Sequence, residues 1–120
     1  MNVEAEVTGF LDCEIEEQVR PDRPKNPPGR MVTLERTGGP SGDVTARATV
    51  ALQCWAESRS EAAALAYRVS KAMLKLKYHP SVYMVTQKSL YHFPGEGGEP
   101  RYQIIYEITT GGCLTRPPSN

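Results

Sequence analysis

The most regular pattern in this chain is the alternation of hydrophobic and polar residues along residues 43–55. One face of this segment carries Val44, Ala46, Ala48, Val50, Leu52 and Cys54, and the other carries mainly Thr45, Arg47, Thr49 and Gln53. A period of two residues is typical of a β-strand with one buried and one solvated face. Residues 31–36 repeat the pattern over a shorter length, with Val32 and Leu34 on one face. Residues 37–43 contain three glycines and a proline, which predicts a turn between the two strands.

The period then changes to between three and four residues. Over residues 59–76 the hydrophobic positions form one stripe, made of Ala62, Leu65, Ala66, Val69, Ala72, Met73 and Leu76. This stripe predicts an amphipathic helix that docks on the sheet. Ser58 and Glu61 have the spacing of a capping box, so we expect the helix to begin near Arg59. Pro80 disfavours the helical conformation for His79 and is expected to end the helix there.

The rest of the chain completes an α-β-β-α-β-β order. Hydrophobic spacing along residues 3–11 predicts a short N-terminal helix, with acidic residues in its first turn, where the helix dipole favours them. Residues 82–93 and 101–109 are rich in β-branched and aromatic residues, which predicts two further strands. We therefore expect an α+β fold, with one four-stranded mixed or antiparallel sheet and two helices packed on it.

Three segments rich in proline or glycine lie outside this framework. Residues 19–30 contain four prolines, which predicts an extended arm without regular hydrogen-bonded structure. It is either a plain surface connection or an arm that lies on a neighbouring subunit. Residues 94–100 predict a flexible hairpin tip, and residues 111–120 predict a flexible C-terminal tail. The single domain is expected to span residues 1–110.

Composition and charge narrow the function classes. A chain of 120 residues supports one hydrophobic core. Fourteen basic residues balance fourteen acidic ones, so no overall field attracts the protein to nucleic acid or to an anionic membrane. No stretch approaches the roughly 20 apolar residues that span a bilayer, and the N-terminus is acidic where a signal peptide would be basic. We expect a protein of cytosolic origin with no membrane partner.

The chemistry-bearing residues do not form a recognisable catalytic, cofactor or metal site. Cys13, Cys54 and Cys113 are widely spaced, with no CxxC motif and no histidine beside them in sequence, which fits neither a disulfide framework nor a zinc site. Cys54 is interpreted as a small buried hydrophobic residue. The glycines of residues 37–43 open a strand rather than a helix, so they do not predict a phosphate-binding loop. We expect no enzyme, no cofactor and no bound metal.

Five residues are candidates for contact with a partner or with the lumen of an assembly. Arg68, Lys71 and Lys75 recur every three or four residues on the helix face opposite its apolar stripe and form a basic ridge. Such a ridge is more often a solvated face, but it also fits an acidic partner or passing DNA backbone. Ile105 interrupts the polar face of the last strand, where a neighbouring subunit could dock. Arg36 is the fifth candidate.

Several segments together resemble the tail terminator (tail completion) proteins of long-tailed phages, especially those infecting actinobacteria. They are Met31-Val32-Thr33-Leu34-Glu35-Arg36-Thr37-Gly38-Gly39, Val50-Ala51-Leu52-Gln53-Cys54-Trp55-Ala56, the alanine-rich helix, and Pro100-Arg101-Tyr102-Gln103. The resemblance covers residues 19–109. The proline-rich arm and the hairpin tip depart from the family's pattern.

The resemblance implies a structural virion protein without catalytic residues. Members of this family form a ring, commonly a hexamer, on the head-proximal end of the tail tube, where the ring ends tube polymerisation and presents the head-joining surface. The implied partners are further copies of the chain, the major tail tube protein and the head–tail connector proteins. Genomic DNA would be only cargo passing through the lumen. The implied location is the virion tail, after assembly in the host cytoplasm.

Other functions remain open from the residues. A head-closure or connector ring would use the same chemistry with a different partner. A nucleic-acid-binding module would use Tyr91, Tyr102 and Tyr106 as exposed stacking platforms, although the neutral net charge argues against it. An enzyme is the least favoured class, since Glu14, Glu16 and Glu17 are interpreted as a solvated acidic run. For either ring, exposed strand edges are candidate subunit contacts.

Overall fold

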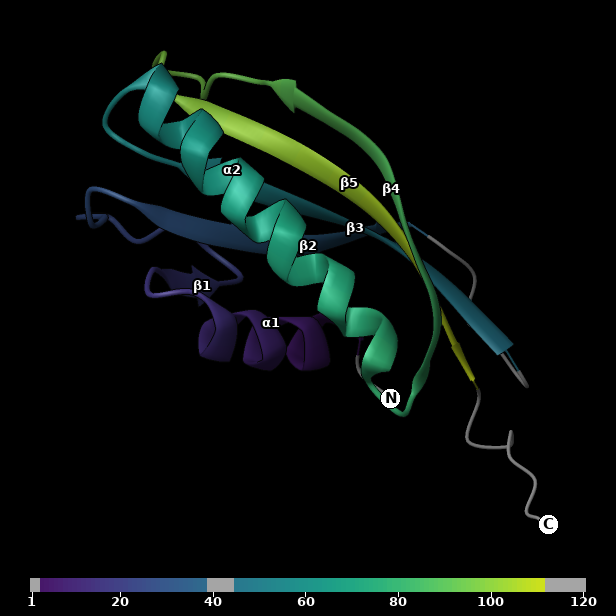
Figure 1. The fold of residues 1–120 in the computed structure, drawn as a ribbon. Helices are drawn as coiled ribbons and strands as arrows, with labels where there is room; N and C mark the ends of the chain where they lie inside the picture. Colours follow the sequence, from purple (N-terminus) through teal and green to yellow (C-terminus); the bar gives the residue numbers. More distant parts are fainter. Residues whose placement is uncertain (1–2, 39–44, 112–120) are drawn as a thin grey trace, which may run out of the picture.

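A five-stranded mixed sheet with two α-helices on one face forms the fold (Figure 1). The computed structural model describes residues 3–38 and 45–111. The elements in chain order are α1 (Val3–Glu14), β1 (Gln18–Arg20), β2 (Met31–Gly38), β3 (Thr45–Trp55), α2 (Arg59–Met73), the 3₁₀ helix η1 (Leu74–Tyr78), β4 (Val82–His92) and β5 (Arg101–Gly111). The predicted α+β class with two helices is confirmed, but the predicted number of four strands is wrong.

The additional strand is β1, at the start of the predicted proline-rich arm. Its three residues pair in parallel with the beginning of β2, and Val19 is buried. The prediction that residues 19–30 lack regular hydrogen-bonded structure is therefore wrong at Val19 and Arg20. Three residues with a single hydrophobic side chain are too few to show a period, and the proline at position 21 follows immediately. The four prolines themselves lie between β1 and β2, where they obstruct no strand pairing.

The sheet order is β1-β2-β3-β5-β4. The pairs β2/β3, β3/β5 and β4/β5 are antiparallel, and the long β3/β5 register runs from Thr45 opposite Gly111 to Trp55 opposite Arg101. β3 and β4 are therefore parallel to each other with β5 between them. The α2 helix is the crossover connection between these two strands, which places it diagonally across the sheet (Figure 1).

The core lies between the sheet and the two helices. All seven residues of the stripe predicted for the α2 region are buried, and Ser58 caps the helix by accepting a hydrogen bond from the Glu61 backbone N–H at 3.2 Å. From α1, the buried side chains are Val3, Val7 and Leu11. The sheet contributes Val50, Leu52, Cys54, Ile104 and Ile108, among others. The predicted start of the helix, its serine cap and its docking face are thus confirmed. The helical stretch ends before His79, but its α-helical part ends at Met73 and continues as the 3₁₀ helix η1.

The sheet face opposite the helices is less solvated than its polar residues predict. Thr33, Gln53 and Gln103 lie on this face, yet all three are buried. They belong to the central strands β2, β3 and β5, where neighbouring strands on both sides shield a side chain from water. The prediction of one buried face and one solvated face therefore fails at the middle of the sheet.

Several predicted boundaries shift by a few residues. The first helix continues to Glu14, three residues beyond its predicted end. Thr37 and Gly38 belong to β2 rather than to the predicted turn, and the remainder of that turn lies outside the described residues. Gly111 is the last residue of β5 rather than the first of a tail, and the rest of the predicted tail also lies outside the described residues. No helix in the described part of the chain is long and apolar enough to cross a membrane.

Candidate interaction surfaces

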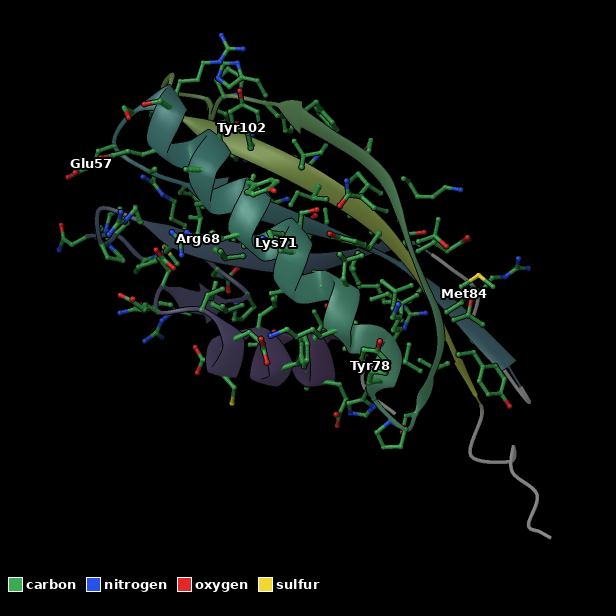
Figure 2. The ribbon with its side chains drawn as sticks, in the orientation of Figure 1. Glu57, Arg68, Lys71, Tyr78, Met84 and Tyr102 are labelled. Carbon is green, nitrogen blue, oxygen red and sulfur yellow. The ribbon has the colours of Figure 1, made fainter. Side chains whose placement is uncertain are left out.

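The predicted basic ridge runs along α2, where Figure 2 shows Arg68 and Lys71, and continues to Lys75 on η1. Two of its three cations are bound to carboxylates of the same chain. Arg68 donates to Glu17 twice, from Nη1 to Oε1 at 3.0 Å and from Nη2 to Oε2 at 2.6 Å. Lys75 donates to Oε1 of Glu14 at 3.1 Å. Lys71 instead lies 5.5 Å from the centroid of the Tyr67 ring. The ridge therefore joins α2 and η1 to the end of α1 and the segment after it, which limits its use for an acidic partner.

Glu17 is the central residue of this contact between α2 and the segment after α1, which we call the seam. Its side chain is only 7% exposed, so the prediction of a solvated acidic run is wrong at this residue. The hydrogen bonds from Arg68 lower the pKa of Glu17, and the charges of Arg68 and Arg30 act in the same direction, while desolvation opposes them. Arg30 Nε lies 3.7 Å from Glu17 Oε2 and ties the end of the arm to the same carboxylate.

We predict that Glu17→Gln lowers the free energy of unfolding at pH 7 by about 1 kcal/mol, since Arg68 remains 44% exposed and its pairing is partly screened by water. Because the folded-state pKa is lowered, the ionised carboxylate stabilises the protein above its ordinary pKa of 4.5, and this contribution is lost as the pH falls below that value.

Urea denaturation of both proteins at neutral and acidic pH measures the effect of Glu17→Gln. The difference between wild type and variant should shrink at acidic pH. Glu16→Gln, at an exposed neighbouring position, is the control and should leave stability unchanged at both pH values. A difference that persists unchanged at acidic pH would show that the charge of Glu17 is not the cause.

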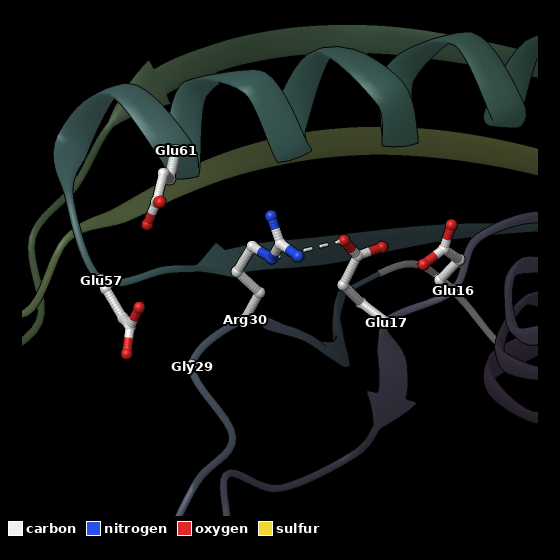
Figure 3. A pocket seen from close by; sticks show the side chains of 6 residues that line it. All are labelled: Glu16, Glu17, Gly29, Arg30, Glu57 and Glu61. Atoms are coloured by element: carbon white, nitrogen blue, oxygen red, sulfur yellow. Dashed lines mark ion pairs between the residues drawn. The ribbon is translucent and has the colours of Figure 1, made fainter.

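A pocket of about 400 Å³ opens beside the seam (Figure 3). It is lined by Glu16, Glu17, Gly29, Arg30, Glu57 and Glu61, so four carboxylates surround one guanidinium. Arg30 is the internal counter-ion of this pocket. Among the described residues, no group of three or more His, Cys, Asp or Glu side chains could hold a metal ion. The pocket supplies negative charge but no arrangement that predicts a reaction.

The remaining two predicted contact residues lie elsewhere. Ile105 is half-buried on the sheet face opposite the helices, between its strand partners Ala51 and Ser89. Arg36 is on β2, where its backbone N–H donates to Glu4 Oε2 at 3.3 Å. The structure thus brings together Arg68, Lys71 and Lys75, and separates them from Ile105 by the full thickness of the sheet.

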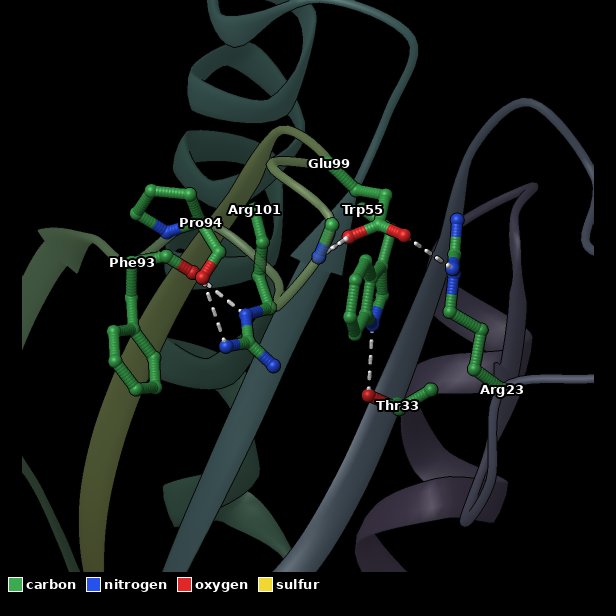
Figure 4. Close-up of polar contacts among 8 residues, drawn as sticks. Arg23, Thr33, Trp55, Phe93, Pro94, Glu99 and Arg101 are labelled. Atoms are coloured by element: carbon green, nitrogen blue, oxygen red, sulfur yellow. Dashed lines mark hydrogen bonds and ion pairs between the residues drawn. The ribbon is translucent and has the colours of Figure 1, made fainter.

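The arm and the start of β5 meet on either side of Trp55 (Figure 4). The guanidinium carbons of Arg23 and Arg101 lie 4.3 and 4.8 Å from the indole ring, and Arg23 also lies 3.8 Å from Glu99 of the tip. Arg101 is held by the Phe93 carbonyl, which accepts from its Nε at 2.6 Å. Cation–π contacts of this kind stabilise by about 0.5–2 kcal/mol each. At Arg23, therefore, the arm lies on its own subunit.

A chain of hydrogen bonds crosses four strands on the same face. Trp55 Nε1 donates to Thr33 Oγ1 at 3.0 Å, and Thr33 donates to Gln53 Oε1 at 2.8 Å. Gln53 Nε2 donates to Gln103 Oε1 at 2.8 Å, and Gln103 donates in turn to the hydroxyl of Tyr91. Every donor points in the same direction, so each bond polarises the next. The buried members of this chain, Thr33, Gln53 and Gln103, each have a hydrogen-bond partner, which offsets the cost of burying a polar group.

The three tyrosines considered for base stacking do not form one platform. Tyr106 is buried, and its hydroxyl donates to Gln87 Oε1 at 2.8 Å, while desolvation raises its pKa to about 12. Tyr102 lies on the helix side of the sheet, where Arg59 donates to its hydroxyl at 3.3 Å. Tyr91 lies on the opposite side. The description of all three as exposed is therefore wrong for Tyr106, which is buried, and for Tyr102, which is half-buried against the core.

The buried cysteine behaves as predicted. Cys54 is buried in the core, and desolvation raises the pKa of its thiol to about 12, so the reactive thiolate is suppressed. Of the histidines, His79 is engaged: its Nδ1 accepts from the Ser81 backbone N–H at 3.1 Å, and its Nε2 lies 3.0 Å from Glu6 Oε1. Cys54 therefore packs in the core, and His79 joins the end of η1 to α1.

Large apolar side chains stay exposed on α2, on η1 and on and just after β4, a feature that was not predicted. Those on α2 and η1 are Tyr67, Leu74 and Tyr78, and those on and just after β4 are Tyr83, Met84, Leu90, Tyr91 and Phe93. Figure 2 shows Tyr78 and Met84 near the same end of the molecule. The sequence does set this part of the chain apart by its charge. Residues 62–95 contain five lysines and arginines and no aspartate or glutamate.

The two edges of the sheet are poorly suited to pairing with another strand. β1 has only three residues. β4 has eleven, but its register with β5 shifts between Val82 and Met84 and again between Gln87 and Ser89. Bulges and an edge lysine, here Lys88, are devices that prevent edge-to-edge association. The predicted use of strand edges as subunit contacts is thereby disfavoured, and side-chain contacts become the better candidate.

No protein-family model matches this sequence, and no curated protein matches it.

Proposed function

We propose that this chain is a structural virion protein that assembles into a ring, caps the head-proximal end of a phage tail tube, ends tube polymerisation and provides the head-joining surface. The observation that carries the proposal is the row of exposed apolar side chains on η1 and β4. Exposed apolar patches of this kind mark sites of protein–protein contact. The resemblance of residues 19–109 to tail terminator proteins supplies the kind of assembly.

The mechanism would rest on surfaces rather than on a reaction. A ring of identical subunits uses heterologous contacts, in which one patch of each subunit binds a different patch of the next. Such a ring ends polymerisation when one of its faces binds the last ring of the tube and its other face cannot bind a further tube ring. A rigid fold favours this role, since the contact surfaces must hold their relative angles for the ring to close.

The ring prediction is tested by sedimentation and negative-stain microscopy of the purified protein, alone and with tail tubes. We expect closed rings of uniform size, commonly six subunits, free in solution or bound at tube ends. The matched control is the same protein carrying Arg47→Glu, an exposed substitution on the sheet face away from η1. Monomers that never bind tube ends would contradict the proposal.

A head-closure or connector ring remains the second candidate, because the same surfaces would serve it. Pull-down against tail tube protein and against portal-side proteins separates the two. A nucleic-acid-binding module is supported only by the basic character of residues 62–95. Steeply salt-dependent binding of single strands would favour it, since phosphate contacts release counterions.

A further inference from the structure

Charge is divided between two segments of the chain, although Arg68 and Lys75 of the basic segment pair with Glu17 and Glu14 of the acidic one. Residues 3–17, which comprise α1 and the segment after it, contain six acidic residues and no lysine, arginine or histidine. Residues 62–95, which comprise most of α2, η1 and β4, contain five cations and no acid. α1 packs beside β1 at one edge of the sheet, and β4 forms the other edge (Figure 1). The net charge of zero conceals this separation.

The acidic side carries a groove. A cavity of about 500 Å³ is lined by Glu4, Ala5, Thr8, Gly9, Pro21 and Leu34, between α1 and the β1–β2 edge. The volume lies in the range that holds bulky side chains and small ligands. A Cβ added at Gly9 would meet nothing within 4 Å, so the helix leaves this space open. Asp12 lies one turn beyond Thr8 and so faces the same side of α1.

The β4 edge, opposite the groove, carries projecting apolar side chains and a cation, which complement the open space and the acidic rim of the groove. Tyr83 is 62% exposed and Met84 is 59% exposed, at the first irregularity of β4, and Lys88 is exposed at the second. Bulges re-aim side chains away from the plane of the sheet. The edge therefore presents an aromatic ring and a thioether together with a cation that has no carboxylate partner among the described residues.

We infer that subunits associate head to tail, with the β4 edge of one copy seated in the α1 groove of the next. The inference rests on the proposed function, because only a repeated heterologous contact builds a ring. Tyr83 and Met84 would fill the groove, and Lys88 would face the acidic residues Glu4 and Asp12 at its rim. The acidic surface suits the cationic edge of a second copy, because the groove lies at the β1 edge of the sheet and Lys88 lies on β4 at the other edge.

Two variants test the two surfaces of the contact, the α1 groove and the β4 edge, one at a time. Gly9→Leu fills the groove, and because no atom lies within 4 Å of the added Cβ and leucine favours helix more than glycine does, it is expected to leave folding intact. Tyr83→Ser combined with Lys88→Glu removes the aromatic side chain and reverses the charge. Each variant alone should weaken self-association by at least about tenfold, as expected for loss of a central aromatic contact.

Mixing the two variants tests the direction of docking. The groove-filled protein retains an intact β4 edge, and the edge variant retains an intact groove. An equimolar mixture should therefore form dimers that cannot grow, seen by sedimentation velocity at high concentration, whereas each variant alone stays monomeric. The matched controls are Ala64→Leu and Tyr67→Ser, exposed positions on the outer face of α2, which should assemble like wild type.

The outcomes distinguish this contact from the proposed function. If wild type forms rings and both variants do so equally well, the docking contact is wrong and the ring stands. If wild type neither self-associates nor binds tube ends, the proposed function itself is wrong. Binding of single-stranded DNA by a monomeric wild type, lost in the edge variant, would show that the cationic edge serves nucleic acid and would overturn the inference.

Discussion

Replacing Leu65 with alanine is expected to lower the free energy of unfolding by about 2–5 kcal/mol. Leu65 lies at the centre of the buried face of α2 and has no exposed surface. Its removal leaves a cavity against the sheet, because β3 and β5 are fixed by their long register and cannot close over the space. The loss combines the transfer free energy of the missing methyl groups with the cost of the cavity.

The same substitution on the same helical segment provides the control. Leu74 is the first residue of η1 and is 67% exposed. Leu74→Ala should change stability by no more than about 0.5 kcal/mol. Urea denaturation followed by circular dichroism measures both variants. Equal effects for Leu65 and Leu74 would mean that the helix is not docked by the predicted stripe.

Replacing Gln53 with leucine is expected to destabilise the protein by about 1–3 kcal/mol. Gln53 is the middle member of the hydrogen-bond chain across β2, β3, β5 and β4. Leucine is of similar size and adds apolar surface, so a simple burial argument would predict no loss. The loss arises because the Thr33 hydroxyl loses its acceptor and the Gln103 carbonyl loses its donor, and both side chains are buried.

A double-mutant cycle with Gln103→Leu tests whether the chain acts as a unit. Once Gln53 is absent, Gln103 has already lost one partner, so its replacement should cost less than it does in wild type. The expected coupling is about 0.5–3 kcal/mol. Thr49→Val, at a half-exposed position on the same strand and face, is the control and should show no coupling. Strictly additive effects would mean that these bonds are energetically independent.

The elements that could be predicted from sequence are those whose signal is local. The α2 helix has a clear period and a serine cap, and its start and its buried face agree with the prediction, whereas its end at Met73 lies before the predicted stop at Pro80. β1 could not be predicted, because three residues have no period and its pairing with β2 is set by the tertiary fold. The burial of Gln53 and Gln103 depends on strand order, which brings together residues 50 positions apart.

The candidate surfaces also divide into features that are visible in the sequence and features that depend on the tertiary fold. The basic residues of α2 are visible in the sequence, but their pairing with Glu14 and Glu17 joins residues 61 and 51 positions apart and needs the docking of α1 to be known. The contact of Arg23 with Trp55 is hidden for the same reason. By contrast, the absence of acidic residues from 62–95 is a property of the sequence itself. It points to a cationic flank without any knowledge of the fold.

These features give the proposed ring a physical basis. The interior is packed, the sheet edges are poorly suited to strand pairing, and the proposed contact surfaces carry side chains of opposite charge at two edges. A subunit built in this way would bind its neighbour through one fixed heterologous contact, and the angle of that contact would set the number of copies. The sheet, held by its hydrogen-bond chain, would keep the two edges at a constant relative angle.

The most direct measurement is the growth of tail tubes in the presence of this protein. Purified tube protein is allowed to polymerise with increasing amounts of wild type, and tube lengths and ends are scored by negative-stain microscopy. We expect shorter tubes, each with a ring of this protein at one end only, and no such effect from the groove-filled variant Gly9→Leu. Tubes of unchanged length with bare ends at every concentration would contradict the proposed function.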